Sequence, residues 1–196
     1  MSTVRVSDVD LVARARQGDS AAFGELVDRH RAAVYRAAMA ALGSAAEAED
    51  AAQDAFLLAY RRLDSFRGDA SFKTWLLTIT WHQAINRRRS LSSVWRRTIS
   101  PKSEEEAESV MANAVASGPS PEEALEQEQL GRGIRRAIRA LSPKLRDALL
   151  LAQAGDYSYE EIGAMLNAPL GTIKWRVSEA RRMIRKHLNA HGYDDV

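Results

Sequence analysis

Residues 142–188 constrain the fold of this chain more than any other stretch, because they carry the start and stop signals of successive helices. Ser142 places a capping hydroxyl directly ahead of Pro143, and proline fits the first turn of a helix. Gly155-Asp156 is a typical helix end. The residues between these signals supply an apolar face, formed by Leu145, Leu149, Leu150 and Leu151.

Two further helices follow at once. Ser158 and Glu161 stand at the spacing of a capping box, which predicts a short helix with Ile162, Met165 and Leu166 inward. Residues 167–169 (Asn-Ala-Pro) break the chain, and a longer helix begins near Leu170. Two helices separated by a turn of about three to four residues are the pattern of a helix-turn-helix.

The last helix of this stretch is strongly basic. Between Leu170 and Leu188 it carries six basic side chains and one acidic side chain. Its apolar residues predict one buried face, made of Ile173, Val177, Ala180, Ile184 and Leu188. A recognition helix presents its exposed N-terminal residues to base edges, while nearby Arg and Lys hold phosphates. A solvated basic helix on a bundle is the alternative, and the tight turn before the helix favours DNA binding.

Composition excludes several classes of protein. The 196 residues suffice for one large or two small domains, and there is no cysteine to form disulfides or thiolate metal sites. The four histidines show no ligand spacing, and no apolar run approaches the roughly 20 residues of a membrane span. The N-terminus lacks a signal-peptide pattern. We therefore expect a soluble, cytoplasmic protein without membrane insertion, metal, cofactor or small-molecule substrate.

Charge is distributed in blocks. Residues 61–97 carry nine basic and two acidic side chains, and residues 131–188 carry twelve basic and five acidic ones. Residues 98–130 between them carry one basic and eight acidic side chains. Two basic blocks separated by an acidic one suggest two modules that face nucleic acid and are joined by a tether.

The remaining chain also reads as helices, and strand-like alternation is absent throughout. We expect helices over residues 8–17, 20–42, 45–63, 71–89 and 121–140, the last interrupted by Gly131 and Gly133. Asp19 or Ser20 caps the second helix and Gly43 ends it. The predicted fold is all-α, with helical domains at 1–90 and 121–196 joined by an acidic flexible linker at 91–120.

Aromatic and basic residues alternate around the fourth helix. A polar loop at residues 64–71 precedes it, and the helix ends in Arg87-Arg88-Arg89. Interleaved aromatic and basic side chains are typical of surfaces that hold single-stranded nucleic acid. We assign Trp75 to the core, whereas Trp81 fits either the core or a nucleic-acid surface.

Two segments resemble a known family. AEDAAQDAFLLAYRRLDSFRGDASFKTWLLTIT resembles the second conserved region of bacterial RNA polymerase sigma factors, and LSPKLRDALLLAQAGDYSYEEIGAMLNAPLGTIKWRVSEARRMI resembles the fourth. The chain as a whole is similar to the small extracytoplasmic-function (ECF) group. The resemblance implies a non-catalytic initiation factor that binds core RNA polymerase, through its β′ clamp and β flap, together with promoter DNA. It also implies an anti-sigma factor as a further partner.

The resemblance also assigns residues. The polymerase-binding face would comprise Asp50, Gln53, Asp54, Phe56, Leu57 and Tyr60. The surface that melts and holds the −10 element would comprise Phe66, Arg67, Asp69, Ser71, Phe72, Trp81, Asn86, Arg87 and Arg88. The −35 reader would comprise Tyr159, Leu170, Gly171, Thr172, Lys174, Trp175, Arg176, Ser178, Glu179, Arg181 and Arg182. Among these, Glu179 has the chemistry to accept a hydrogen bond from cytosine N4.

Other functions find less support in the residues. A conventional helix-turn-helix regulator with an N-terminal sensing or dimerisation domain remains the alternative, although such a domain has no reason to carry an acidic and aromatic helix followed by a basic loop. No nucleophile–base pair, carboxylate pair or phosphate loop stands at usable spacing, so an enzyme is not predicted.

Overall fold

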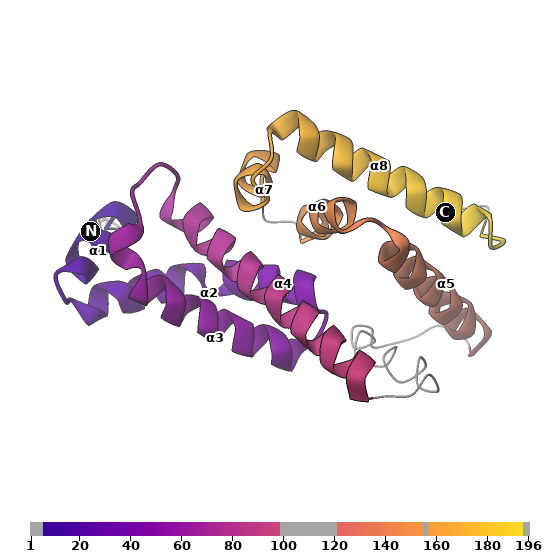
Figure 1. The fold of residues 1–196 in the computed structure, drawn as a ribbon, viewed down its shortest axis with the longest axis horizontal. Coiled ribbons are helices and arrows are strands. Elements are labelled where there is room, and N and C mark those ends of the chain that lie inside the picture. The colour runs from indigo at the N-terminus through magenta and orange to yellow at the C-terminus, as the bar shows by residue number, and fades with distance from the viewer. Residues whose placement is uncertain (1–5, 99–120, 155–156, 194–196) are drawn as a thin grey trace. The chain divides into compact units, whose positions relative to one another are not determined.

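The computed structural model describes residues 6–98, 121–154 and 157–193. Every element within these ranges is helical, which confirms the all-α class (Figure 1). The elements in chain order are α1 (Asp8–Arg16), α2 (Ser20–Leu42), α3 (Ala45–Arg61), the 3-10 turn η1 (Leu63–Ser65), α4 (Phe72–Thr98), α5 (Pro121–Ala140), α6 (Pro143–Gln153), α7 (Tyr159–Met165) and α8 (Leu170–Asn189). Most of the expected acidic linker lies outside the described residues, as does Gly155-Asp156, the expected end of α6.

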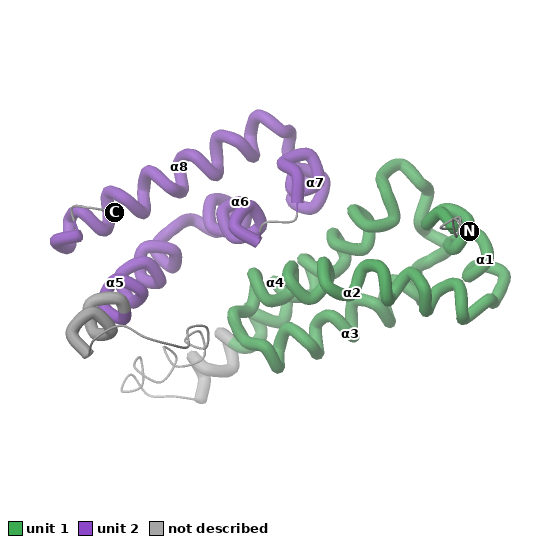
Figure 2. The backbone as a smooth tube through the Cα atoms, turned by 180° about the vertical axis from the view of Figure 1, so that it is seen from behind, with its two compact units in different colours: residues 1–111 green, residues 112–196 purple. Residues whose placement is uncertain are grey.

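The chain divides into two compact units, residues 1–111 and residues 112–196 (Figure 2). In the first unit α2, α3 and α4 pack against one another, and α1 packs against α2. In the second unit α8 packs against α5, α6 and α7.

The buried side of α3 consists of alanine alone: Ala48, Ala51, Ala52, Ala55 and Ala59. Small side chains allow helix axes to approach closely, and Ala48 and Ala51 pack against Ala38 of α2. Among the larger apolar residues of α3, Leu57 and Tyr60 are exposed, whereas Phe56 and Leu58 are half-buried.

Local signals set the ends of α2 as the sequence predicts. Asp19 is the N-cap, and its side chain accepts a hydrogen bond from the backbone N–H of Ala22 at 3.1 Å. At the other end Gly43 has φ of 71°, and its N–H donates to the carbonyl of Met39 at 2.8 Å. A left-handed residue at this position favours glycine, which has no Cβ to clash.

The fourth helix is longer than expected. It runs to Thr98 instead of ending near Arg89, because residues 90–98 contain no proline or glycine to stop it. Trp81 lies at its centre with 1% of its surface exposed, which decides for the core and against a nucleic-acid contact. Phe72, also assigned to the −10 surface, is buried as well.

The expected interruption of α5 is absent. The helix passes through Gly131 and Gly133 without a break. A Cβ built on Gly133 would lie 3.2 Å from the Tyr193 ring and 3.3 Å from Leu188. Glycine at this position therefore allows α5 to pack closely against the end of α8, which compensates for its low helix propensity.

The turn between α7 and α8 is tightly built. Ser158 and Glu161 form the predicted capping box at the start of α7. Asn167 adopts a left-handed conformation with φ of 46°, which asparagine tolerates better than most residues. Next to it, the N–H of Ala168 donates to the carbonyl of Gly163 at 2.9 Å. These contacts give α7 and α8 the geometry of a helix-turn-helix.

Candidate nucleic-acid interface

The first two turns of α8 have one buried and one open side. Ile173 and Val177 are buried against the rest of the second unit. Lys174, Trp175 and Ser178 are exposed, and Trp175 has 59% of its surface accessible. A large aromatic side chain on the open side of a helix adds no packing contacts to the core. This side is therefore available to a partner, which is the arrangement of a recognition helix.

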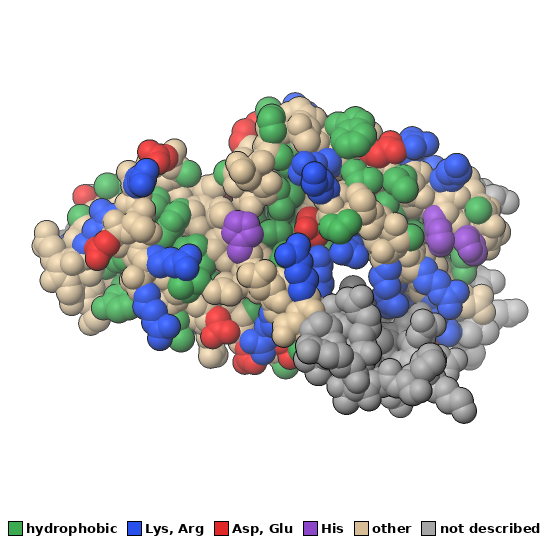
Figure 3. Space-filling view, viewed as in Figure 1, with side chains coloured by type: hydrophobic (Ala, Val, Ile, Leu, Met, Phe, Trp, Pro, Cys, Tyr) green, Lys and Arg blue, Asp and Glu red, His purple; other side chains and the backbone are tan. Residues whose placement is uncertain are grey.

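A shallow hollow of about 390 Å³ lies beside this helix. It is lined by Tyr159, Lys174, Val177, Ser178, Arg181, Arg182 and Arg185. Lys and Arg side chains recur along α8 in the space-filling view (Figure 3). Arg185 was not among the predicted site residues, although its spacing of four residues from Arg181 places both on one side of the helix. The cationic groups suit binding to phosphates.

Two of the predicted −35 residues bind each other. Arg182 donates through Nε and Nη2 to the two carboxylate oxygens of Glu179, at 2.8 and 2.6 Å. The hydrogen bond from Arg182 lowers the pKa of the Glu179 carboxyl below its usual range. Glu179 can therefore bind a cytosine amino group only if Arg182 shares or releases an oxygen.

The other predicted −35 residues lie at the start of α8 or next to it. Gly171 is exposed, whereas Leu170, Thr172, Arg176 and Tyr159 are half-buried. The grouping of these residues around one end of one helix agrees with the expected site. Their individual contacts with DNA stay predictions.

In the first unit, the predicted polymerase-binding residues share the outer side of α3. Leu57 and Tyr60 have 56% and 46% of their surface exposed. Asp50, Gln53 and Asp54 are exposed, and Phe56 is half-buried. The Tyr60 ring meets Phe23 edge-on, with the ring centroids 4.9 Å apart. Large apolar groups beside carboxylates on a helix surface are typical of a protein-binding face.

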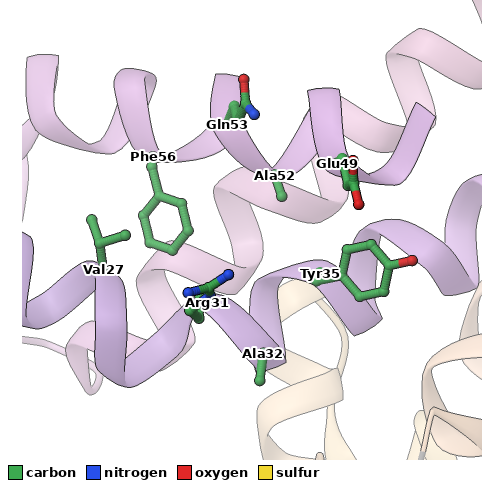
Figure 4. A pocket seen from close by; sticks show the side chains of 8 residues that line it. All are labelled: Val27, Arg31, Ala32, Tyr35, Glu49, Ala52, Gln53 and Phe56. Carbon is green, nitrogen blue, oxygen red and sulfur yellow. The ribbon is translucent and has the colours of Figure 1, made fainter. Parts of the chain in front are cut away.

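A groove of about 610 Å³ lies between α2 and α3 and is lined by residues of both helices (Figure 4). The Phe56 ring points from α3 towards α2, and Val27 of α2 points back towards it. The other lining residues are Arg31, Ala32, Tyr35, Glu49, Ala52 and Gln53. The groove thus contains the aromatic side chains of Phe56 and Tyr35 and the charged side chains of Arg31 and Glu49.

Arg87 of α4 connects two predicted surfaces. It was assigned to the −10 element, yet its guanidinium binds Glu47 and lies 2.8 Å from Asp50 and 3.6 Å from Asp54. The hydrogen bond to Glu47 is the main reason why the pKa of Arg87 is raised. Asp50 and Asp54 belong to the polymerase-binding prediction, so the two predicted surfaces meet at this side chain.

Replacing Arg87 by alanine is expected to destabilise the first unit by on the order of 1 kcal/mol, because three neighbouring carboxylates lose their shared cation. The effect should shrink in 1 M salt, which screens the remaining repulsion. Urea unfolding at low and high salt measures this. Arg67→Ala, in an exposed loop, is the control and should be neutral. A loss of stability that is the same at both salt concentrations would contradict an ionic role.

The loop before α4 is built on aromatic side chains. Phe66 packs against Trp75 and Phe72, with ring centroids 5.3 and 5.8 Å away. The Ser71 hydroxyl accepts from the N–H of Thr74 at 3.1 Å and so caps α4. Arg67 and Asp69 are exposed at the loop tip. The tip is thus the part of this loop that is open to a ligand.

The basic stretch of α4 at residues 86–89 is only partly open. Asn86 is exposed, as predicted for a contact residue. Arg88 instead donates to the carbonyl of Ala41 at 3.3 Å, in the last turn of α2. Such a cation stabilises unpaired carbonyls at a helix C-terminus. Arg88 therefore has a structural partner in addition to its predicted contact with DNA.

Neither a metal site nor a membrane span stands out in the part of the chain that the structure describes. Within it, His, Asp and Glu side chains form no group of three or more that could hold a metal ion. None of its helices combines the length and the apolar character that crossing a bilayer requires.

Comparison with known proteins gives matches to both units. The family model of sigma-70 region 2 matches residues 26–94, and that of sigma-70 region 4 matches residues 132–184. The ECF RNA polymerase sigma factor SigW of Bacillus subtilis is 33% identical over 177 residues, which cover 90% of this chain and 94% of that protein. The chain belongs to the ECF sigma factor family. The ECF RNA polymerase sigma-E factor of Escherichia coli is 36% identical over 186 residues, covering 92% and 93%.

Solved structures resemble this ECF sigma factor as well. The sigma factor RpoE from Bartonella quintana, solved in complex with the anti-sigma factor NepR, is 26% identical with a TM-score of 0.56, and the match covers 85% of this chain and 96% of that one. CnrH, solved with the cytosolic domain of CnrY, shares the fold at 23% identity with a TM-score of 0.60, covering 93% and 97%. Region 2 of this sigma factor thus corresponds to α2–α4 and region 4 to α5–α8.

Proposed function

We propose that this ECF sigma factor binds core RNA polymerase and directs it to promoters with defined −35 and −10 elements. In this proposal the outer side of α3 binds the β′ clamp, and α8 reads the −35 element. The tip of the loop at residues 66–71 and the exposed part of α4 hold the melted −10 strand. The polymerase performs the chemistry, so the chain itself needs no catalytic residue.

One observation carries the proposal. The core side of α3 is entirely alanine, while Leu57 and Tyr60 face outward beside Asp50 and Asp54. This distribution leaves Leu57 and the open part of Tyr60 for a partner, because the packing of the unit buries neither side chain. Exposed apolar anchors with acids at the rim fit a protein surface rich in basic residues. A sensing domain of a conventional regulator would not require such a face next to a basic helix.

Transcription with purified bacterial core RNA polymerase tests the proposal. A pool of upstream DNA fragments is transcribed with and without the protein, and the transcripts are sequenced. Transcripts that start at defined sites only when the protein is added would support the proposal, and their shared upstream sequences would give the two elements. Binding to duplex DNA without binding to core polymerase would instead support the conventional regulator.

Replacing Leu57 by aspartate is expected to weaken binding to core polymerase by about 30-fold, which corresponds to about 2 kcal/mol for a central apolar anchor. Fluorescence anisotropy of the labelled protein with core polymerase measures this affinity. Val9→Asp is a matched control, because Val9 is an apolar side chain that is 74% exposed on α1, a different helix of the same unit. Equal affinities for Leu57→Asp and the wild-type protein would remove α3 from the proposed interface.

We also propose control by an anti-sigma factor, as expected from the solved complex of RpoE with NepR. Among the residues of the first unit whose side chains the structure describes, α3 has more large exposed apolar side chains than any other helix, so we expect an inhibitor to cover this face. An inhibitor that binds this face competes with core polymerase, and Leu57→Asp should weaken both complexes. Retention of inhibitor binding by this variant would place the inhibitor elsewhere.

A further inference from the structure

We propose that Arg16 of α1 is a positioning residue for the −10 loop, defined here as residues 66–71. This inference rests on the proposed function of that loop. The Arg16 guanidinium donates to the backbone carbonyl of Leu63 through Nε at 3.2 Å and through Nη2 at 3.0 Å. Its Nη2 also donates to the carbonyl of Phe66. One side chain therefore holds two carbonyls, three residues apart, at the point where the loop begins.

The position of Arg16 itself is well fixed. It follows Ala15, which is buried together with Leu11 and Val12 on the inner side of α1. At the other end of this helix Asp8 binds Arg29 of α2 at 3.0 Å and His30 at 2.7 Å. The guanidinium thus extends from a helix that is packed and tethered. α1 lies next to the segment that leads into the loop (Figure 1).

The two carbonyls stand at the two ends of the turn. Residues 63–65 form a 3-10 turn, and Phe66 is the residue that follows it. The N–H of Phe66 donates to the carbonyl of Leu63 at 3.1 Å, and the guanidinium binds the same oxygen from the side. Planar guanidinium groups suit two acceptors at once, which an ammonium group with its less directional donors matches poorly. The contact therefore sets the direction in which the chain leaves the turn.

Phe66 transmits this direction to the loop. While its carbonyl is held by Arg16, its ring packs on Phe72 and Trp75 of α4. The loop is consequently clamped at its base from both sides, by α1 through the backbone and by α4 through the ring. Arg67 and Asp69 remain exposed beyond this clamp. A pre-positioned tip loses less conformational entropy when it takes up an unpaired base.

The match to sigma-70 region 2 begins at residue 26, so α1 lies outside the matched residues. A purely structural role for Arg16 is the competing explanation. The two differ in what the loss of the guanidinium changes: a positioning residue affects loop motion and promoter opening, whereas a structural residue affects the stability of the whole unit and binding to core polymerase.

The test compares Arg16→Ala and Arg16→Lys with Arg14→Ala in the full chain. Arg14 is a matched control, because it also extends from the end of α1 but binds the carboxylate of Asp19, at 2.9 and 2.7 Å. Amide hydrogen exchange over residues 64–70 reports loop motion without polymerase. Transcription from a promoter selected by the wild-type holoenzyme, as a closed duplex and with its −10 region pre-opened, reports melting.

We expect Arg16→Ala to speed exchange in the loop and to lower transcription from the duplex by about tenfold, with a smaller loss on the pre-opened template. Arg16→Lys should restore part of the activity, and Arg14→Ala should behave as wild type. Unchanged exchange or unchanged duplex transcription for Arg16→Ala would overturn the inference. Equal losses on both templates together with weaker core binding would also overturn it, in favour of a structural role.

The proposed function and the inference about Arg16 are overturned by different results. If the wild-type protein supports no promoter-dependent transcription with core polymerase, the proposed function fails, and the inference about Arg16 fails with it. If the wild-type protein is active and Arg16→Ala is as active as the wild type, only the inference about Arg16 is overturned.

Discussion

Replacing Trp81 by alanine is expected to lower the free energy of unfolding of the first unit by about 3–5 kcal/mol. The side chain is 1% exposed, so its loss leaves a cavity that closely packed helices fill only in part. Urea unfolding followed by tryptophan fluorescence measures the change. In a Trp175→Ala background the remaining tryptophans all belong to the first unit, so the signal reports that unit alone.

Trp175→Ala is also the matched control for this prediction. It makes the same chemical change at a side chain that is 59% exposed, and the expected change in stability is below about 0.5 kcal/mol. Binding of the second unit to duplex −35 DNA should instead weaken. A Trp81→Ala protein of wild-type stability that binds single-stranded DNA poorly would contradict the core assignment and restore Trp81 to the −10 surface.

Replacing Gly163 by alanine is expected to destabilise the helix-turn-helix by about 1–3 kcal/mol. A Cβ at this position would lie 2.7 Å from the carbonyl oxygen of Ala168, which is backbone of the turn and cannot rotate away. Helix propensity alone predicts the opposite sign, because alanine is favoured over glycine within a helix by about 0.5–1 kcal/mol. The close approach of α7 and the turn outweighs this preference.

Two measurements check the effect of Gly163→Ala: the amide exchange rates of α7 and α8, and the affinity for duplex −35 DNA. Exchange should become faster and affinity lower, since the turn orients α8. Gly171→Ala serves as the control for stability, because a Cβ there meets nothing within 4 Å. It should leave exchange unchanged or slow it. A Gly163→Ala protein with exchange as slow as that of Gly171→Ala would show that the turn tolerates the added methyl group.

Most patterns that depend on neighbouring residues could be predicted from the sequence, although Ser142, at the N-cap position of α6, makes no capping hydrogen bond through its side chain. The cap at Asp19, the left-handed Gly43 and the capping box of Ser158 and Glu161 are all present where expected. Each involves atoms within a few residues of one another, so the sequence contains both partners. The bounds of α8 and its buried face followed for the same reason, except that Ile184 is only half-buried, since a period of 3.6 residues marks one side of a helix.

Partners that lie far apart in the sequence could not be predicted from it. The sequence assigns the arginine run at residues 87–89 to DNA, and the structure adds that Arg87 binds acids on α3 and Arg88 binds a carbonyl of α2. A charge run shows that a segment is polar and does not reveal which partner the fold brings to it. Arg16 was missed because its acceptors are backbone carbonyls 47 and 50 residues away, and every residue type has such a carbonyl.

The sequence by itself determined the all-α class, the order of the helices, the helix-turn-helix and the family, because caps, breakers and periodicity act over one or two turns. Tertiary structure alone decided that Trp81 is core, that α3 turns alanines inward and Leu57 outward, and that Arg87 joins α4 to α3. The physical reason is that α3 and α4 carry apolar residues on more than one side. Which side is buried depends on the shape of the helix packed against it, and only the assembled bundle supplies that shape.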